Sequence, residues 1–240
     1  MIIQPGTRDI WLILAHGAGG NMNSEHIAAL AQAFVEVGLG VVRFNFAYRD
    51  AGKSIPSPMP KLISEYQAVV ESIQRELSPE KLLIGGHSMG GRVASMLAAD
   101  PPPQPSRASG RGSLTGSPFP ACGGGSLTGS PSPACGGGPG RGIYGLVLLS
   151  YPLHPPDKPE KLRVEHLPRI QVPTLCFEGT RDPFCTPDIL VSATKDLPHF
   201  ELIWFDGADH SLHAPKAFGR SDRETRAQIA AKVVSWAEGL

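Results

Sequence analysis

The stretch KLLIGGHSMGGRVASM, residues 81–96, places a serine between glycines directly after an apolar run. The apolar run predicts a buried strand, and residues 91–100 predict a helix. A serine at a sharp turn between a strand and a helix exposes its hydroxyl above the sheet. Gly86 and Gly90 would relieve crowding where the two elements nearly touch. We therefore predict that Ser88 is a nucleophile, the alternative being an ordinary serine that caps the helix.

Strands and helices alternate on both sides of this stretch. Apolar runs rich in β-branched residues predict buried strands at 10–17, 40–46, 81–86, 143–150, 172–179 and 200–207. Capped segments with a helical apolar pattern lie at 23–38, 60–77, 91–100, 187–197 and 221–240. This alternation predicts an α/β fold with a mostly parallel central sheet and helices on both faces. The connection after the strand at 143–150 is too short for a large cap.

Polar clusters follow the predicted strands at the points where the strands end. They read HGAGG (16–20), GHSMGG (86–91), GTRDPF (179–184) and DGADHSL (206–212). In a parallel sheet the ligand site lies at the carboxyl ends of the strands, so these clusters should meet at one edge. Together they supply a serine, an aspartate and a histidine.

The residues GHSMG, 86–90, resemble the nucleophile elbow of the α/β-hydrolase fold superfamily. Ser88, Asp182 and His210 also follow that fold's chain order of nucleophile, acid and base. Further phrases look like those of the small, lidless, dienelactone-hydrolase-like branch, namely HGAGG, RFNFAYRDAG, YPLHPP, GTRDPF and DHSL. Bacterial relatives of the testis-expressed protein 30 group carry similar phrases. The resemblance covers nearly the whole chain and implies a minimal α/β-hydrolase fold, with little about the substrate.

The resemblance assigns a base and an acid to Ser88. His210 follows the last predicted strand, where this fold delivers its base, and Asp182 follows the preceding strand and would orient the imidazole. Asp206 and Asp209 lie so near His210 in sequence that we expect them to form the turn instead.

The other histidines have weaker claims to the role of base. We expect His213 to be a solvated neighbour and His87 to pack or hydrogen-bond locally. His16 is expected to brace the loop that follows its strand.

An acyl-transfer site also needs donors for the oxyanion that forms in the transition state. We predict the backbone N–H groups of Met89 and Ala18 in this role. The competing interpretation of HGAGGN as a phosphate-binding loop fails, because the motif lacks the lysine and the serine or threonine of a P-loop. Tyr48, Tyr151 and His154 also lie at predicted strand ends and are candidates for the substrate pocket.

Residues 101–142 interrupt the alternation with a segment rich in proline, glycine and serine. Within it, GSLTGSPFPACGG (112–124) is followed by GSLTGSPSPACGG (125–137), which differs at one position. Such a composition offers too little apolar surface to offset the entropy of ordering. We expect a single domain, 1–240, with a tandem-repeat insert. The alternative is a binding arm or a redox loop that uses Cys122 and Cys135.

Composition argues against several classes of partner. Lysine plus arginine equals aspartate plus glutamate at 22 each, so no basic field favours nucleic acid or an anionic membrane surface. The apolar run IWLILA is too short to span a bilayer and lacks the features of a signal peptide. The four cysteines form no C-x-x-C pair and are expected to be reduced thiols. A cytoplasmic location is the default expectation, and no spacing suggests a metal or other cofactor.

These features predict a serine hydrolase that cleaves carboxylic esters through an acyl-enzyme. Thioester or amide hydrolysis would use the same residues. The alternative from another class is a non-catalytic interaction scaffold with the same fold. A peptidase would need a cap or an additional domain, for which the chain has no room. The sequence indicates neither the natural substrate nor the oligomeric state.

Overall fold

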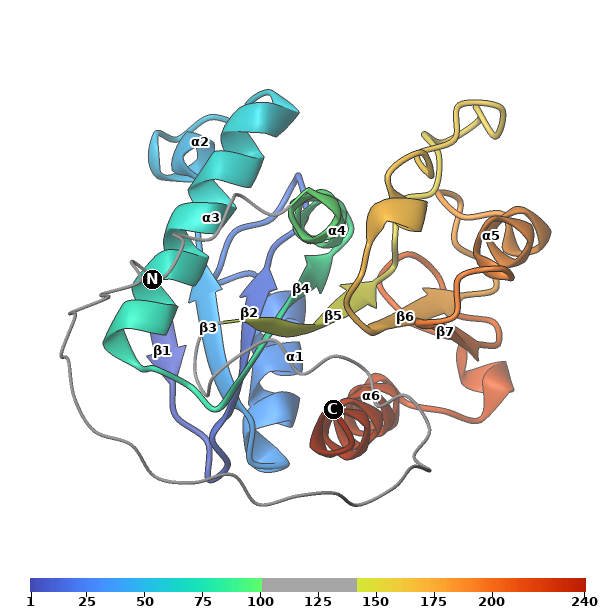
Figure 1. The fold of residues 1–240 in the computed structure, drawn as a ribbon. Coiled ribbons are helices and arrows are strands. Elements are labelled where there is room, and N and C mark those ends of the chain that lie inside the picture. Colours follow the sequence, from blue (N-terminus) through green and yellow to red (C-terminus); the bar gives the residue numbers. More distant parts are fainter. Residues whose placement is uncertain (101–141) are drawn as a thin grey trace, which may run out of the picture.

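The computed structural model describes residues 1–100 and 142–240, and its strands form one seven-stranded sheet (Figure 1). The spatial order is β1-β3-β2-β4-β5-β6-β7. The strands are β1 (Ile2–Gln4), β2 (Ile10–Ala15), β3 (Gly40–Phe44), β4 (Lys81–His87), β5 (Ile143–Leu149), β6 (Thr174–Gly179) and β7 (Phe200–Phe205). All neighbours are parallel except β1, which pairs antiparallel with β3. The predicted fold class is confirmed, and the short edge strand β1 was not predicted.

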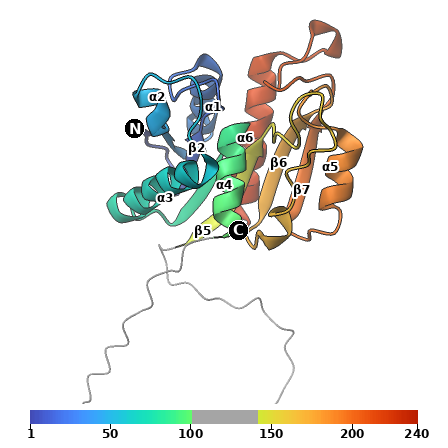
Figure 2. The same cartoon turned by 90° about the horizontal axis from the view of Figure 1, so that it is seen from above.

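Helices cover both faces of the sheet, as the two views show (Figure 1, Figure 2). One face packs against α1 (Glu25–Glu36) and α6 (Asp222–Glu238). The other packs against α3 (Met59–Glu76), α4 (Met89–Ala99) and α5 (Pro187–Thr194). Short turns are α2 (Ala47–Asp50), η1 (Leu167–Arg169) and η2 (Lys216–Phe218). Within the described residues, η1 is the only helical turn between β5 and β6, so no large cap is inserted there.

Local sequence signals set the ends of the helices. Ser221 and Glu224 form a capping box at the start of α6, each accepting from the other's backbone N–H. Helix α1 ends just before Gly38, which has a φ of 93° that side-chain-bearing residues rarely adopt. The five predicted helices are confirmed, with ends shifted by at most three residues.

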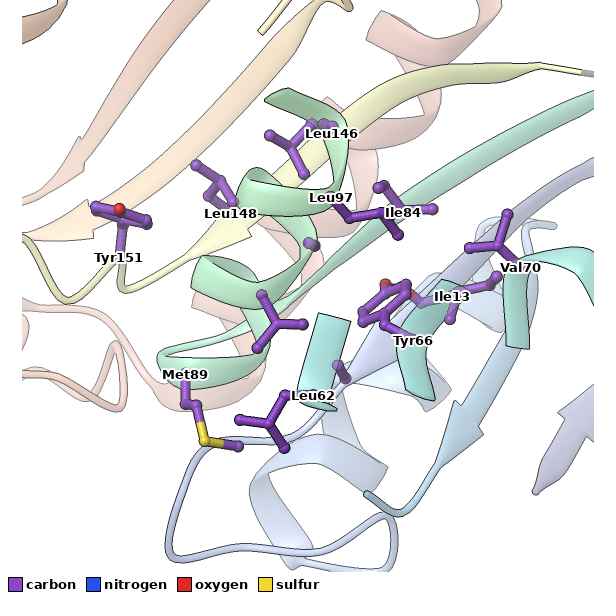
Figure 3. Close-up of a cluster of buried hydrophobic side chains, with 14 of the residues drawn as sticks. Ile13, Leu62, Tyr66, Val70, Ile84, Met89, Leu97, Leu146, Leu148 and Tyr151 are labelled. Carbon is purple, nitrogen blue, oxygen red and sulfur yellow. The ribbon is translucent and has the colours of Figure 1, made fainter. Parts of the chain in front are cut away.

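The core beneath α3 and α4 fixes the strand that leads to Ser88. Figure 3 shows Ile13 and Ile84 of neighbouring strands facing Leu97 of α4 and Tyr66 of α3. Burying one aliphatic side chain of this kind stabilises the folded state by about 1.5–3 kcal/mol. The Tyr66 hydroxyl lies 2.8 Å from backbone carbonyl oxygens of both β2 and β4, which share its one proton, and it accepts the Gly85 N–H at 2.9 Å. The core therefore clamps β2 and β4 side by side just below the elbow.

The predicted insert at 101–142 follows α4 and, apart from its last residue, lies outside the described residues. None of the helices that the structure describes is both long and apolar enough to cross a membrane.

Candidate active site

Ser88 is the single residue between the end of β4 and the first residue of α4. Its backbone has φ 53° and ψ −119°, a strained conformation for a residue with a side chain. Its N–H donates to the carbonyl of Leu149 at 2.9 Å, which ties the turn to β5. The serine predicted from the glycine-rich stretch therefore occupies a sharp strand-to-helix turn.

Two glycines make this turn possible through close approach of the backbone. A Cβ atom on Gly86 would lie 2.6 Å from the carbonyl oxygen of Ala15 in β2. A Cβ atom on Gly90 would lie 2.6 Å from the same oxygen and 2.7 Å from that of His16. Because atoms do not approach so closely without displacement, both positions need glycine for the turn to sit against β2.

The structure brings Ser88, His210 and Asp182 into one hydrogen-bonded chain. Nε2 of His210 lies 2.8 Å from Oγ of Ser88, and Nδ1 lies 2.7 Å from Oδ2 of Asp182. The Asp182 side chain is fully buried, while that of His210 is 20% exposed. An ionised carboxylate only accepts hydrogen bonds, so Nδ1 carries the proton and Nε2 is free to accept from the serine hydroxyl. This geometry can transfer a proton from Ser88 to His210.

The second carboxylate oxygen of Asp182 accepts the backbone N–H of Phe184 at 2.8 Å. The ring of Phe184 lies 4.3 Å from that of His210, measured between centroids, with 34° between the planes. Phe184 therefore covers the imidazole and also helps to fix its acid. Sequence reasoning missed this residue, although it closes the quoted motif GTRDPF.

The predicted oxyanion donors lie on the loop after β2 and at the start of α4. Met89 is the first residue of α4, where a backbone N–H has no partner inside the helix. The loop that carries Ala18 is fixed by Tyr48, whose hydroxyl donates to the Ala18 carbonyl at 2.7 Å. His16 donates from Nδ1 to the Gly17 carbonyl at 2.8 Å, which agrees with a bracing role. Burial lowers the pKa of His16, which favours the neutral ring.

The three pocket candidates are buried, and their polar atoms bond to the protein itself. The Tyr48 hydroxyl donates to the Ala18 carbonyl. The Tyr151 hydroxyl donates to the Arg163 carbonyl at 2.6 Å. His154 bonds through Nε2 to the hydroxyl of Thr186 at 2.9 Å. As placed, these side chains support loops around the site, and their contact with a substrate stays a prediction.

Neighbours of His210 in sequence form the turn, as expected. Oδ1 of Asp209 accepts the backbone N–H groups of Ser211 and His213, at 2.8 and 3.1 Å. His213 is exposed and pairs with Asp222 at 2.7 Å. Neither Asp209 nor His213 contacts the chain of hydrogen bonds that starts at Ser88.

A second buried carboxyl group lies close to Asp182. Glu178 near the end of β6 is fully buried, and its Oε1 accepts the backbone N–H of Tyr151. Among the described residues its Oε2 has no hydrogen-bond partner. Burial, together with the nearby charge of Asp182, raises the pKa of Glu178 well above its usual range, which favours the neutral form. Its signal in the sequence was a charged residue inside the predicted buried strand at 172–179.

The described ranges, 1–100 and 142–240, contain no group of three or more His, Cys, Asp or Glu side chains that could hold a metal ion. A cavity of about 400 Å³ lies between α1 and α6, lined by His26, Arg226 and Asp222 among others. Its lining does not include Ser88, Asp182 or His210.

Comparisons with known proteins agree with the fold. A family described as "Alpha/beta hydrolase domain" matches residues 8–238. An alpha-beta serine hydrolase homologue from Coxiella burnetii is 18% identical with a TM-score of 0.64, over 97% of this chain and 90% of that one. A serine hydrolase without a lid from Xanthomonas campestris is 20% identical with a TM-score of 0.62, over 97% and 84%. A dienelactone hydrolase from Anabaena variabilis is 16% identical with a TM-score of 0.62, over 98% and 88%.

Proposed function

Because the chain belongs to the alpha/beta hydrolase domain family and resembles its lidless, dienelactone-hydrolase-like branch, we propose that it is a serine hydrolase of carboxylic esters. One observation carries the proposal, namely the continuous chain from Ser88 Oγ through His210 to Asp182, with contacts of 2.8 and 2.7 Å. A nucleophile, a base and an orienting acid in this order are what acyl transfer requires.

In the proposed mechanism Ser88 Oγ attacks the acyl carbon while Nε2 of His210 takes the hydroxyl proton. Asp182 holds the imidazole in the correct tautomer and stabilises the imidazolium. The backbone N–H groups of Ala18 and Met89 bind the oxyanion of the tetrahedral intermediate. His210 then protonates the leaving alcohol, which departs and leaves an ester on Ser88. Water activated by the same histidine hydrolyses this ester and releases the acid.

The first test is intact-mass labelling with a fluorophosphonate, comparing the wild type with Ser88→Ala. We expect a single adduct on the wild type and none on the variant, because only an activated serine displaces fluoride from phosphorus at a useful rate. No adduct on a well-folded wild type would favour the non-catalytic scaffold.

The second test separates the classes of acyl substrate. We expect a short aryl ester such as p-nitrophenyl acetate to be hydrolysed, with the rate lost in Ser88→Ala. A panel of matched ester, thioester and anilide substrates would then rank the three bonds by kcat/KM. Suppose that the wild type takes the fluorophosphonate label but, unlabelled, hydrolyses the thioester or the anilide with the higher kcat/KM. This result would contradict the ester assignment and leave the serine mechanism intact.

A further inference from the structure

Successive histidine rings contact one another beside Ser88. The centroid of His87 lies 4.7 Å from that of His26 in α1 and 5.1 Å from that of His210. His87 is the residue immediately before Ser88, so it belongs to the elbow, whereas His210 belongs to the loop after β7. The proposed mechanism uses His210 and assigns nothing to His87.

A hydrogen bond joins His87 to the main chain of His210. Nε2 of His87 lies 2.8 Å from the backbone carbonyl oxygen of His210. A carbonyl oxygen can only accept, so Nε2 of His87 carries the proton and donates. This bond spans 123 positions of the chain and connects the elbow directly to the loop that carries the base.

The other nitrogen of the same ring lies against the loop after β2. A Cβ atom on Gly17 would lie 3.1 Å from Nδ1 of His87, tighter than ordinary van der Waals contact. Gly17 precedes Ala18, a proposed oxyanion donor. A single side chain of the elbow therefore bonds to the base loop and restricts the space at Gly17 in the oxyanion loop.

His87 does not compete with His210 for the proton of Ser88. Burial lowers the pKa of His87 to about 3, with a further contribution from His26, so the ring is neutral near pH 7. The titratable groups that act on it are His26 and His210. Its donor nitrogen is occupied by the His210 carbonyl, while the Ser88 hydroxyl lies against Nε2 of His210.

We propose that His87 is a positioning residue, whose N–H holds the main chain of His210 so that the imidazole stays aligned between Ser88 and Asp182. The inference rests on the proposed function of Ser88 and His210. Asp182 and Phe184 fix the ring of His210 from the side of β6. The bond from His87 fixes its backbone from the side of β4. Small displacements of a reacting group lower rates steeply, which gives such an anchor its effect.

The test compares His87→Gln with His87→Met. Glutamine places an amide N–H about where Nε2 lies in histidine, and methionine has a similar length without a donor. We expect His87→Met to lower the rate constant of fluorophosphonate labelling and kcat by about tenfold or more. His87→Gln should stay within about threefold of the wild type. Equal rates in the two variants would overturn the proposal, as would a loss in His87→Gln comparable to that in His210→Gln.

A proton NMR measurement keeps the proposal separate from the proposed function. The Nδ1–H of His210 that is bonded to Asp182 should give a low-field resonance, assigned by its absence in His210→Gln. We expect it in the wild type and in His87→Gln, and broadened or lost in His87→Met at a temperature where thermal melts show all forms folded. An unchanged resonance in His87→Met would overturn the positioning role. A resonance that depends on His87 in a wild type that takes no label would refute only the hydrolase function.

Discussion

Two serine–histidine pairs in this molecule have the same separation and different surroundings. Ser88 Oγ lies 2.8 Å from Nε2 of His210, and Ser95 Oγ lies 2.8 Å from Nε2 of His166. Both serines come from the same short stretch of sequence, one at the elbow and one inside α4. The distance alone therefore does not distinguish a nucleophile from a structural tether.

The direction of the hydrogen bond separates the two pairs. The Ser95 hydroxyl donates to the Arg92 carbonyl at 2.8 Å, so His166 must donate to it from Nε2. In the other pair, Asp182 fixes the proton on Nδ1 of His210, which leaves Nε2 to accept from Ser88. Only the second arrangement can remove a proton from the serine.

Backbone and burial reinforce this difference. Ser88 has a strained φ of 53° at the carboxyl end of the central strand β4, whereas Ser95 is a fully buried helical residue. His166 has no carboxylate partner among the described residues. Burial, assisted by the charge of Arg92, lowers the pKa of His166 to about 4. The proposed reactivity of Ser88 therefore rests on an acid partner and a strained turn, which the pair at Ser95 lacks.

Replacing each serine by alanine gives the largest expected contrast. Ser88→Ala should lower kcat/KM for an aryl ester by at least about a thousandfold, since the nucleophile is lost. Ser95→Ala should keep kcat/KM within about threefold and lower the free energy of unfolding by about 1 kcal/mol, through loss of a buried hydrogen bond. Steady-state kinetics and urea unfolding measure both effects. A comparable loss of activity in Ser95→Ala would break the distinction between the pairs.

The two buried carboxyl groups provide the next contrast. Asp182→Asn should lower kcat by about a thousandfold or more, because an amide no longer holds His210 in the required tautomer. Glu178→Gln should keep kcat within about tenfold, because burial raises the pKa of Glu178 and so favours the neutral carboxyl group that glutamine resembles. Melting curves control for folding. If the losses were reversed, Glu178 would be the acid of the site.

The pH dependence of stability tests the environment of His166. Its pKa is about 4 in the folded chain, below its ordinary value of 6.5, so the unfolded chain binds the extra proton first as the pH falls. The wild type should therefore lose stability from about pH 6.5 toward pH 4, by up to about 1 kcal/mol per pH unit from this group. His166→Gln keeps an N–H donor for Ser95 and cannot titrate. Its free energy of unfolding, measured by urea at pH 7.5 and 5, should fall less than that of the wild type.

The smallest effect is expected from a deletion within the tandem-repeat insert, which contains no member of either serine–histidine pair. We propose one domain, 1–240, interrupted at about 101–142. Deleting Ser106–Gly140 should leave the melting temperature and ester hydrolysis close to those of the wild type. Asp100 at the end of α4 keeps its own anchor, an ion pair with Arg169 at 2.9 Å. A collapse of the melting temperature would point instead to a structural, binding or redox role for the segment and its two cysteines.

Local patterns in the sequence were sufficient to predict most of the alternating strands and helices. Apolar runs and capped helical segments predicted six of the strands and five of the helices. Ser88 could be found because a nucleophile elbow needs glycines at fixed offsets, and the contacts of Gly86 and Gly90 with β2 supply the physical reason. Strand β1 was missed because its three residues are too few to show a period.

By itself, the sequence determined the alternation of strands and helices and the turn at Ser88. It also showed that polar residues gather at the carboxyl ends of the strands. The family resemblance had assigned His210 to Ser88, but only the tertiary structure places the two side chains within 2.8 Å and pairs Ser95 with His166. The pairing of Ser88 with His210 spans 122 positions, and no local pattern reports contacts at that range. The roles of Phe184, Glu178 and His87 likewise depend on strand order and on packing between loops. Hydrophobic periodicity specifies how a segment folds locally, whereas side-chain contacts depend on how the segments are stacked.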